Sequence, residues 1–253
     1  MEPAALPSFV RRRLDPAQRF GLRLTLFAIA TTLVFVPFGL LLAQVVDEGP
    51  LTRYDRAVVE DLHELVRANE WLVTPLEVLS FLGKPIWFYG IVGLACAYLL
   101  WRGLRRLAIY LVATGLGGGA VDTAVKVIVS RDRPRLEEPF ATAFGQSFPS
   151  GHAFTSLVMY GALLLVFLPV IPKRFRVWAI ASCATLVGSI AFSRLALGVH
   201  FLSDVLGGLA LGAAWLLAST AAFSIWRTER GRKPVDPKRG LEPESAKELR
   251  PSA

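Results

Sequence analysis

The sequence predicts an all-α, polytopic membrane protein with six transmembrane helices and an interfacial helix between the first and the second. Of its 253 residues, 53% are hydrophobic and only 19% are charged, and the mean hydropathy is +0.48. A soluble domain of this size needs more charged residues to cover its surface, and two cysteines are too few for a disulfide scaffold. The apolar residues also occur in long uncharged blocks, which is typical of helices surrounded by lipid.

Six segments are long and apolar enough to cross a bilayer, for which a helix needs about 20 residues. Four of them contain no Asp, Glu, Lys, Arg or His: residues 24–46, 153–172, 177–193 and 205–226. Residues 86–101 are also uncharged but short, and residues 107–129 carry Asp122 and Lys126 near their far end. The first segment is too long for the core of a signal peptide, so we expect it to remain as an anchoring span.

Residues 55–82, between the first two spans, have a mixed character. Apolar positions recur there at helical spacing with charged residues between them: Val58, Val59, Leu62, Leu65 and Val66. This pattern predicts an amphipathic helix that lies in the membrane interface. Residues 72–82 are compatible with a second helix, short and partly inserted.

Lys and Arg residues are divided unequally between the two sides of the predicted protein. The side that carries both termini has 19 of the 28 basic residues. The positive-inside rule therefore places both termini in the cytoplasm. We expect the spans to lie in the inner (plasma) membrane of the cell. The asymmetry accounts for the net charge of +8, so we predict attraction to anionic lipid and no nucleic-acid partner.

Three regions follow from these spans. Residues 1–21 are expected to form a cytoplasmic N-terminal tail, and residues 22–227 the six-span domain. Residues 228–253 are rich in Pro and in charges of both signs, and this composition predicts a disordered cytoplasmic C-terminal tail.

Three polar clusters lie on the face of the membrane opposite the termini. They are Lys126 to Arg133-Pro134, then Pro149-Ser150-Gly151-His152, and then Ser193-Arg194 through His200 to Asp204. The topology follows from hydrophobicity and loop charge alone, yet it brings all three clusters to one side. This coincidence predicts a single site on that side.

The first cluster can direct two cations at one ligand. Lys126 and Arg133 are seven residues apart, which is about two helical turns or roughly 10 Å if the helix continues. Pro134 disfavours the helical conformation for Arg133 and is expected to end the helix there. The two side chains could then approach one small dianion from different directions.

The second and third clusters supply an anion site and a polarised imidazole. Ser150 as a helix N-cap beside Gly151 leaves free backbone N–H groups at a positive helix end, and His152 would project from that first turn. His200 and Asp204 are four residues apart and share one helix face. The carboxylate can fix the tautomer of the imidazole and make its other nitrogen nucleophilic.

Each cluster also has a purely structural interpretation. Lys126 alone could extend to the membrane surface or pair with Asp122 one turn earlier. The Ser-Gly-His sequence alone is a helix start. His200 and Asp204 alone could form a structural hydrogen bond.

A zinc site formed by His152, His200 and Asp204 is a further alternative, because two His and a carboxylate can hold zinc. Three cations in the same clusters would repel a metal ion: Lys126, Arg133 and Arg194. Three cations with two His suit an anion better, so we predict no metal and no other cofactor.

Together the clusters resemble the tripartite signature of the type 2 phosphatidic acid phosphatase (PAP2) superfamily, lipid phosphatases related to the vanadium haloperoxidases. That signature is Lys, six residues, Arg-Pro; then Pro-Ser-Gly-His; then Ser-Arg, five residues, His, three residues, Asp. Every position is matched between Lys126 and Asp204, and the six-span layout extends the resemblance over most of the chain. Three ordered motifs with fixed internal spacing are a specific match.

The resemblance implies a role for each matched residue. His200 would attack phosphorus and form a phosphohistidine, with Asp204 orienting it. His152 would be the general acid that protonates the leaving oxygen and later the base that activates water. The remaining matched residues would hold the phosphoryl oxygens: Lys126, Arg133, Ser150, Gly151 and Arg194. Fixed cations of this kind can neutralise a phosphoryl group without Mg²⁺.

The resemblance also implies a lipid phosphate or diphosphate as the partner, held at the membrane surface while its tail stays in the bilayer. Among six-span bacterial members, undecaprenyl (polyprenyl) diphosphate is the substrate favoured by family frequency, with the monophosphate as product. The alternative is a phosphatidate or phosphatidylglycerophosphate phosphatase. A non-catalytic lipid-binding or transport protein on the same scaffold is an alternative of another class. A haloperoxidase is disfavoured, because those relatives are soluble.

Overall fold

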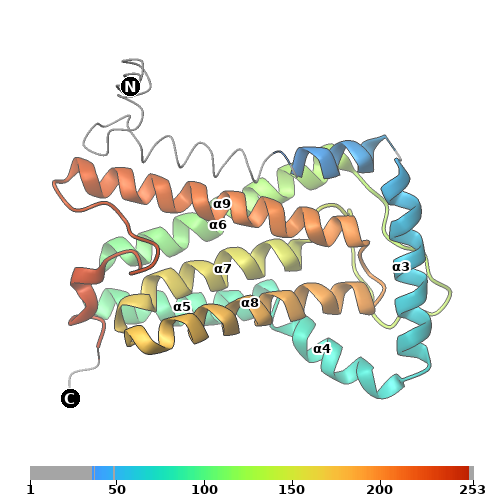
Figure 1. Cartoon of the computed structure of the whole chain (residues 1–253), viewed down its shortest axis with the longest axis horizontal. Coiled ribbons are helices and arrows are strands. Elements are labelled where there is room, and N and C mark those ends of the chain that lie inside the picture. The colour runs from blue at the N-terminus through green and yellow to red at the C-terminus, as the bar shows by residue number, and fades with distance from the viewer. Residues whose placement is uncertain (1–35, 37, 48, 251–253) are drawn as a thin grey trace, which may run out of the picture.

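The computed structural model describes residues 36, 38–47 and 49–250, and this part of the chain contains helices and no β-strand. Its long helices run side by side along the longest axis of the molecule (Figure 1). They are α5 (Pro85–Trp101), α6 (Arg105–Val129), α7 (Gly151–Phe167), α8 (Lys173–Ala196) and α9 (Leu202–Glu229). The prediction of an all-α fold is confirmed for the described residues.

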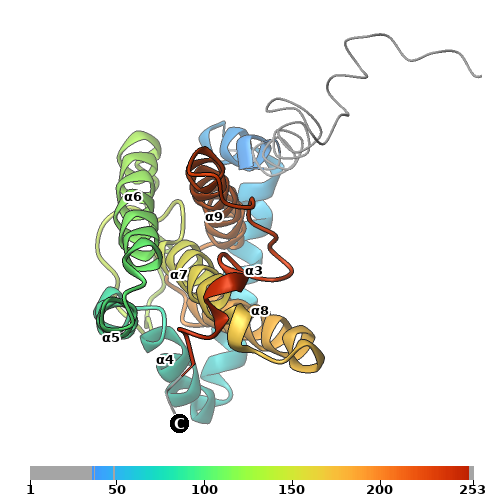
Figure 2. The same ribbon diagram turned by 90° about the vertical axis from the view of Figure 1, so that its left-hand side faces the viewer.

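Helix α7 lies at the centre of the bundle and contacts α5, α6, α8 and α9. Figure 2, which looks along the bundle, shows these helices around it. Half of the most apolar stretch of α7 is buried, against 11% for α6 and 17% for α8. The outer helices therefore present apolar side chains outward, as expected for surfaces that face lipid.

Within the part of the chain that the structure describes, four helices are long and apolar enough to cross a membrane by themselves: α6, α7 with its 3₁₀ extension to Val170, α8 and α9. A fifth span results if Glu70–Phe81 and Pro85–Trp101, which meet at 45°, count as one bent span. The predicted span 86–101 is helical as α5. Most of the predicted first span, 24–46, lies outside the described residues, although residues 38–46 are helical.

Helix α3 (Pro50–Arg67) lies across the right-hand end of the bundle in Figure 1 and contacts α8 and α9. It begins with Pro at its first position, where no backbone N–H is needed. Its buried residues are Asp55, Val59 and Val66, so a helix with one buried face is present within 55–82, whereas its position in the membrane interface stays a prediction. The predicted short helix at 72–82 is α4 (Val73–Phe81), preceded by the 3₁₀ turn η1 (Glu70–Leu72).

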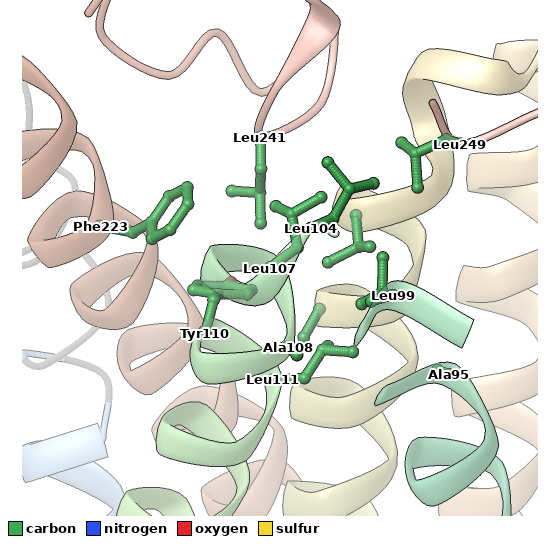
Figure 3. Packing of buried hydrophobic residues seen from close by; sticks show 12 residues of the cluster. Ala95, Leu99, Leu104, Leu107, Ala108, Tyr110, Leu111, Phe223, Leu241 and Leu249 are labelled. Atoms are coloured by element: carbon green, nitrogen blue, oxygen red, sulfur yellow. The ribbon is translucent and has the colours of Figure 1, made fainter. Parts of the chain in front are cut away.

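The C-terminal segment differs from its prediction. Residues 228–253 were expected to be disordered, but residues up to 250 fold back on the bundle and include the 3₁₀ turn η3 (Pro243–Ala246). Leu241 and Leu249 are buried against the α5–α6 turn, around Leu99, Leu104 and Leu107 (Figure 3).

Paired charges allow this highly charged segment to pack. Glu242 is fully buried and lies 2.9 Å from the buried Arg227 of α9 and 3.2 Å from Arg106 of α6. The Leu241 N–H also donates to the carbonyl of Leu165 at 3.0 Å. Composition predicts disorder for such a sequence because it counts charges without knowing which of them meet.

Candidate active site

The three sequence clusters converge on one cavity of about 700 Å³ at the end of the bundle that α3 and α4 cover. Six of the eight predicted site residues line it: Lys126, Arg133, Gly151, His152, Arg194 and His200. The other two, Ser150 and Asp204, are fully buried next to lining residues. The single site predicted from the sequence is therefore present as a spatial cluster.

The end of α6 is where the prediction for the first cluster was wrong. We expected Pro134 to end the helix at Arg133, but α6 ends at Val129 and Ser130 adopts a left-handed conformation with φ 49°. The Ser130 N–H donates to the carbonyl of Lys126 at 2.9 Å and its hydroxyl to that of Val127 at 2.7 Å. These bonds close the helix with a left-handed cap, so Arg133 belongs to the loop that follows.

Arg133 is held by backbone carbonyls and reaches the ring of His200. Its Nη1 donates to the carbonyl of Val199 at 2.8 Å and lies 3.1 Å from His200 Nε2. Its other donors bond carbonyls of the loop before α7: Phe144, Gly145 and Gln146. Burial lowers the pKa of Arg133 and Asp204 opposes this, but a guanidinium stays charged at neutral pH.

His200 lies in the connection between α8 and α9 and is almost completely buried. Its Nδ1 is 3.5 Å from Asp204 Oδ2, so Nε2 is the nitrogen that faces Arg133. Arg133 can only donate, so Nε2 carries the lone pair. Burial lowers the pKa of His200 to about 4, although the Asp204 carboxylate acts in the opposite direction. The ring is thus neutral at pH 7 and available as a nucleophile.

Asp204 is fixed by donors on both of its oxygens. Oδ2 accepts hydrogen bonds from the Ser147 hydroxyl at 2.5 Å and from the Phe201 N–H at 2.8 Å. The second of these bonds caps the start of α9. Oδ1 accepts from Arg131 Nη1 at 2.6 Å. Within the described residues, no three His, Cys, Asp or Glu side chains are arranged to hold a metal ion, so the zinc site considered for Asp204 and the two His is not supported.

The sequence prediction missed Arg131 and the residues around it. Arg131 joins Asp204 to Asp55 of α3, whose Oδ2 lies 2.8 Å from Nη2 of the guanidinium. Asp55 also accepts from the Ser203 N–H at 2.8 Å and from its hydroxyl at 2.5 Å. The available signals were a carboxylate among the apolar positions of an amphipathic segment and an extra Arg inside the first motif.

The second cluster has the predicted geometry. Ser150 is the N-cap of α7, and Gly151 and His152 form its first turn. A side chain at Gly151 would come within 3.0 Å of Lys126 Nζ, so glycine leaves room for the ammonium. Within the described residues, Ser150 Oγ and His152 Nε2 are buried without a hydrogen-bond partner.

Lys126 and Arg194 complete the cationic lining. Lys126 Nζ lies 2.5 Å from Asp122 Oδ2, so the ion pair considered from the sequence is present, and both residues line the cavity. Arg194 is buried and donates to the hydroxyl of Ser80 on α4, while its Nε has no partner among the described residues. Buried donors without partners beside three cations fit the oxygens of a phosphoryl group.

The chain belongs to the PAP2 superfamily and is a membrane phosphatase of that family. Residues 106–227 match the sequence profile of the superfamily. The chain is 30% identical over 201 residues to the lipid A 1-phosphatase of Rhizobium etli, covering 72% of this chain and 80% of that protein. It is 32% identical over 186 residues to phosphatidylglycerophosphatase B of Bacillus subtilis, covering 69% and 86%.

A solved structure supports the fold. The chain resembles the crystal structure of a transmembrane PAP2-type phosphatidylglycerolphosphate phosphatase from Bacillus subtilis, with a TM-score of 0.68 and 22% identity. The match covers 75% of this chain and 94% of that one. The arrangement of helices around α7 is therefore that of the PAP2 membrane fold.

Proposed function

We propose that this phosphatase removes a terminal phosphate from a lipid headgroup through a covalent phosphohistidine on His200. The observation that carries the proposal is the position of His200 Nε2. It lies 3.1 Å from Arg133 at the wall of a cavity that Lys126, Arg194 and His152 also line. A neutral nucleophile surrounded by fixed cations is suited to attack a phosphorus atom that carries negative oxygens.

In the first step, Nε2 of His200 forms a bond to phosphorus while the bond between phosphorus and the leaving oxygen breaks. His152 protonates the leaving oxygen, so the dephosphorylated lipid leaves as a neutral alcohol or as a monophosphate. Asp204 accepts the Nδ1 proton in a hydrogen bond and stabilises the charge that develops on the ring. The cations neutralise the equatorial oxygens: Lys126, Arg133 and Arg194.

In the second step, water attacks the phosphorus of the phosphohistidine and the bond to Nε2 breaks. His152 is neutral after the first step and can accept a proton from the water. The products are inorganic phosphate and free His200. Ser150 and the Gly151 N–H, at the positive start of α7, hold a phosphoryl oxygen through both steps. The protein's own cations supply the charge stabilisation, so we expect no metal requirement.

The names of the relatives point to two different lipids. One relative is a phosphatidylglycerophosphatase, whose name refers to a glycerophospholipid, and another is a lipid A 1-phosphatase. We place phosphatidylglycerophosphate first among the substrates, because the match covers 86% of the phosphatidylglycerophosphatase, and lipid A 1-phosphate second. Undecaprenyl diphosphate, favoured by family frequency, stays a prediction, because neither name refers to it.

We also propose six spans in the inner (plasma) membrane, with cytoplasmic termini and an extracytoplasmic cavity. The basic turns expected in the cytoplasm meet at the end of the bundle opposite the cavity, where Arg106 and Arg227 pair with Glu242. A single Cys at Glu138, which is 70% exposed, should react with an impermeant maleimide in intact cells, in a background lacking Cys96 and Cys183. A Cys at the exposed Arg239 should not react, and the reverse pattern would contradict this topology.

The direct test is phosphate release by the purified protein in detergent, in the presence of EDTA. The panel is phosphatidylglycerophosphate, phosphatidate, undecaprenyl diphosphate and lipid A 1-phosphate. We expect release from at least one of them, inhibition by vanadate, and a labelled phosphoprotein that is stable to alkali and labile to acid. Activity that disappears in EDTA and returns with Mg²⁺ would contradict the mechanism, and no release from any lipid would contradict the function.

A further inference from the structure

A largely buried arginine, Arg131, connects the helix that crosses the end of the bundle to the carboxylate behind His200. We propose that Asp55 and Arg131 are positioning residues for phosphoryl transfer, which hold Asp204 so that it can orient His200. This inference rests on the proposed function. Asp55 lies outside residues 106–227, which match the family profile, so the three motifs do not include it.

The geometry is that of one guanidinium bridging two carboxylates. Nη2 of Arg131 lies 2.8 Å from Asp55 Oδ2, and Nη1 lies 2.6 Å from Asp204 Oδ1. Both carboxylates are fully buried, and the Arg131 side chain is 13% exposed. The guanidinium also lies over the ring of Phe201, 4.3 Å from its centroid. A planar guanidinium can make both contacts at once, whereas an ammonium is a single point charge.

The charges explain why Arg131 is needed at this place. Asp55 and Asp204 are two buried carboxyl groups that share one guanidinium. Without Arg131, Asp204 would lose one of the charges that stabilise its ionised form while remaining desolvated, which favours its protonation. A protonated Asp204 could no longer stabilise positive charge on the His200 ring. Arg131 therefore keeps Asp204 ionised.

Asp55 acts on the third motif in a second way. Its carboxylate accepts both the N–H and the hydroxyl of Ser203, which belongs to the first turn of α9. Asp204 is the next residue in that turn. Because Arg131 occupies Oδ1 of Asp204, Oδ2 is left on the side of His200 Nδ1. Helix α3 thus fixes both the backbone and the carboxylate that set the direction of the imidazole.

The test compares Asp55→Asn with Glu242→Gln, a substitution of the same kind in the buried Arg227 cluster at the opposite end. We expect Asp55→Asn to lower kcat by roughly 10- to 100-fold, by analogy with the loss on removing the partners that orient a metal-ligating His. KM should change less than about threefold, because Lys126, Arg133 and Arg194 keep their places. Glu242→Gln should leave kcat and KM unchanged in protein that remains folded.

Arg131→Lys and Arg131→Gln provide a second series that keeps or removes the charge. The expected order of kcat is wild type, then Arg131→Lys, then Arg131→Gln, with unfolding temperature measured for each variant. Wild-type kcat in folded Asp55→Asn, or equal losses of kcat in Asp55→Asn and Glu242→Gln, would overturn the inference. Failure of the wild-type protein to release phosphate would instead contradict the proposed function.

Discussion

Two arginines, at opposite ends of the bundle, each contact two carboxylates. Arg131 lies between Asp55 and Asp204 at 2.8 and 2.6 Å. Arg227 lies 2.9 Å from Glu242 and 2.5 Å from Glu244. In each cluster the arginine forms an ion pair with a fully buried carboxylate, and burial of one ion pair therefore does not distinguish a functional site from a structural one.

The difference lies in what surrounds each cluster. At the Arg227 end, the C-terminal segment closes the cluster with the buried side chains of Leu241 and Leu249. At the Arg131 end there is a cavity, and His152 Nε2, Ser150 Oγ and Arg194 Nε lack partners within the described residues. At the Arg227 end, the buried atoms without a hydrogen bond among the described residues, Arg227 Nη1 and Glu242 Oε1, form an ion pair at 2.9 Å. Polar atoms with neither a hydrogen bond nor an ion pair, beside a cavity, distinguish the other end as the site.

The largest expected effect is at the cavity end. His200→Ala should abolish formation of the phosphoenzyme, because it removes the only proposed nucleophile. His152→Ala should instead slow the reaction most for substrates with poor leaving groups, since only these need the proton. Labelling with a radioactive substrate measures the amount of phosphoenzyme and the rate at which it forms, and His63→Ala is the control. Equal labelling of His200→Ala and wild-type protein would refute the assignment.

The next effect is on stability at the opposite end. Glu242→Ala should lower the free energy of unfolding by about 3–5 kcal/mol, because it leaves Arg227 buried without its main partner. The kcat of the folded fraction should stay at the wild-type value. Thermal unfolding in detergent and phosphate release at low temperature measure the two quantities. A large fall in kcat without loss of stability would mean that this cluster is not structural.

The ionisation of His200 gives a third difference. All three His of the sequence lie at the cavity end, so titration of an imidazole reports on that end alone. The pKa of His200 is lowered by burial to about 4, whereas the unfolded chain has a value of about 6.5. The unfolded chain binds more protons between these values, so the fold should lose stability as the pH falls from about 6.5 toward 4.

NMR of protein with isotope-labelled histidine measures the protonation of His200 directly. The resonances are assigned with variants of His63 and His152. His200 should remain neutral at pH 6 and become protonated only near pH 4. Protonation with a midpoint near 6.5 would show that the ring is solvated rather than buried.

Regular features of the site could be predicted because they depend on local spacing. The uncharged blocks predicted the long helices, and Ser150 at the start of one of them predicted the N-cap of α7. These inferences need only the geometry of one helix and the side of the membrane on which each loop lies. The contact between His200 and Asp204 was also predicted, but the shared helix face on which that prediction rested was wrong, because His200 precedes the N-cap Phe201 of α9.

The missed features depend on contacts between distant segments. Asp55, Val59, Leu62 and Val66 share one face of α3, so the sequence placed a carboxylate on an apolar face but gave no partner for it. That partner, Arg131, is 76 residues away. The folded C-terminal segment was missed for the same reason, since its charges are neutralised by residues of other helices.

Among the described residues, Lys84 is a cation without an ion pair at the cavity end of the bundle, and it gives the smallest expected effect. It is the N-cap of α5, it is exposed, and it lines the cavity between α4 and the first turn of α7. It makes no ion pair with another described residue, whereas Arg106 and Arg227 at the closed end both pair with Glu242. An ammonium in this place can meet a second phosphate of the headgroup while the first is at His200.

Lys84→Gln should therefore lower kcat/KM by roughly threefold to tenfold for substrates with two phosphates, which corresponds to about 1 kcal/mol for an exposed charge pair. Phosphatidylglycerophosphate and undecaprenyl diphosphate belong to this group. Phosphatidate has one phosphate and should change less than about twofold. Lys173→Gln, at the start of α8 and away from the cavity, is the matched control. The test is the difference in kcat/KM between the two kinds of substrate. A contact to the second phosphate cannot slow a substrate that lacks one. An equal fall in kcat/KM for phosphatidate would therefore mean that Lys84 acts on the shared phosphate or on the fold.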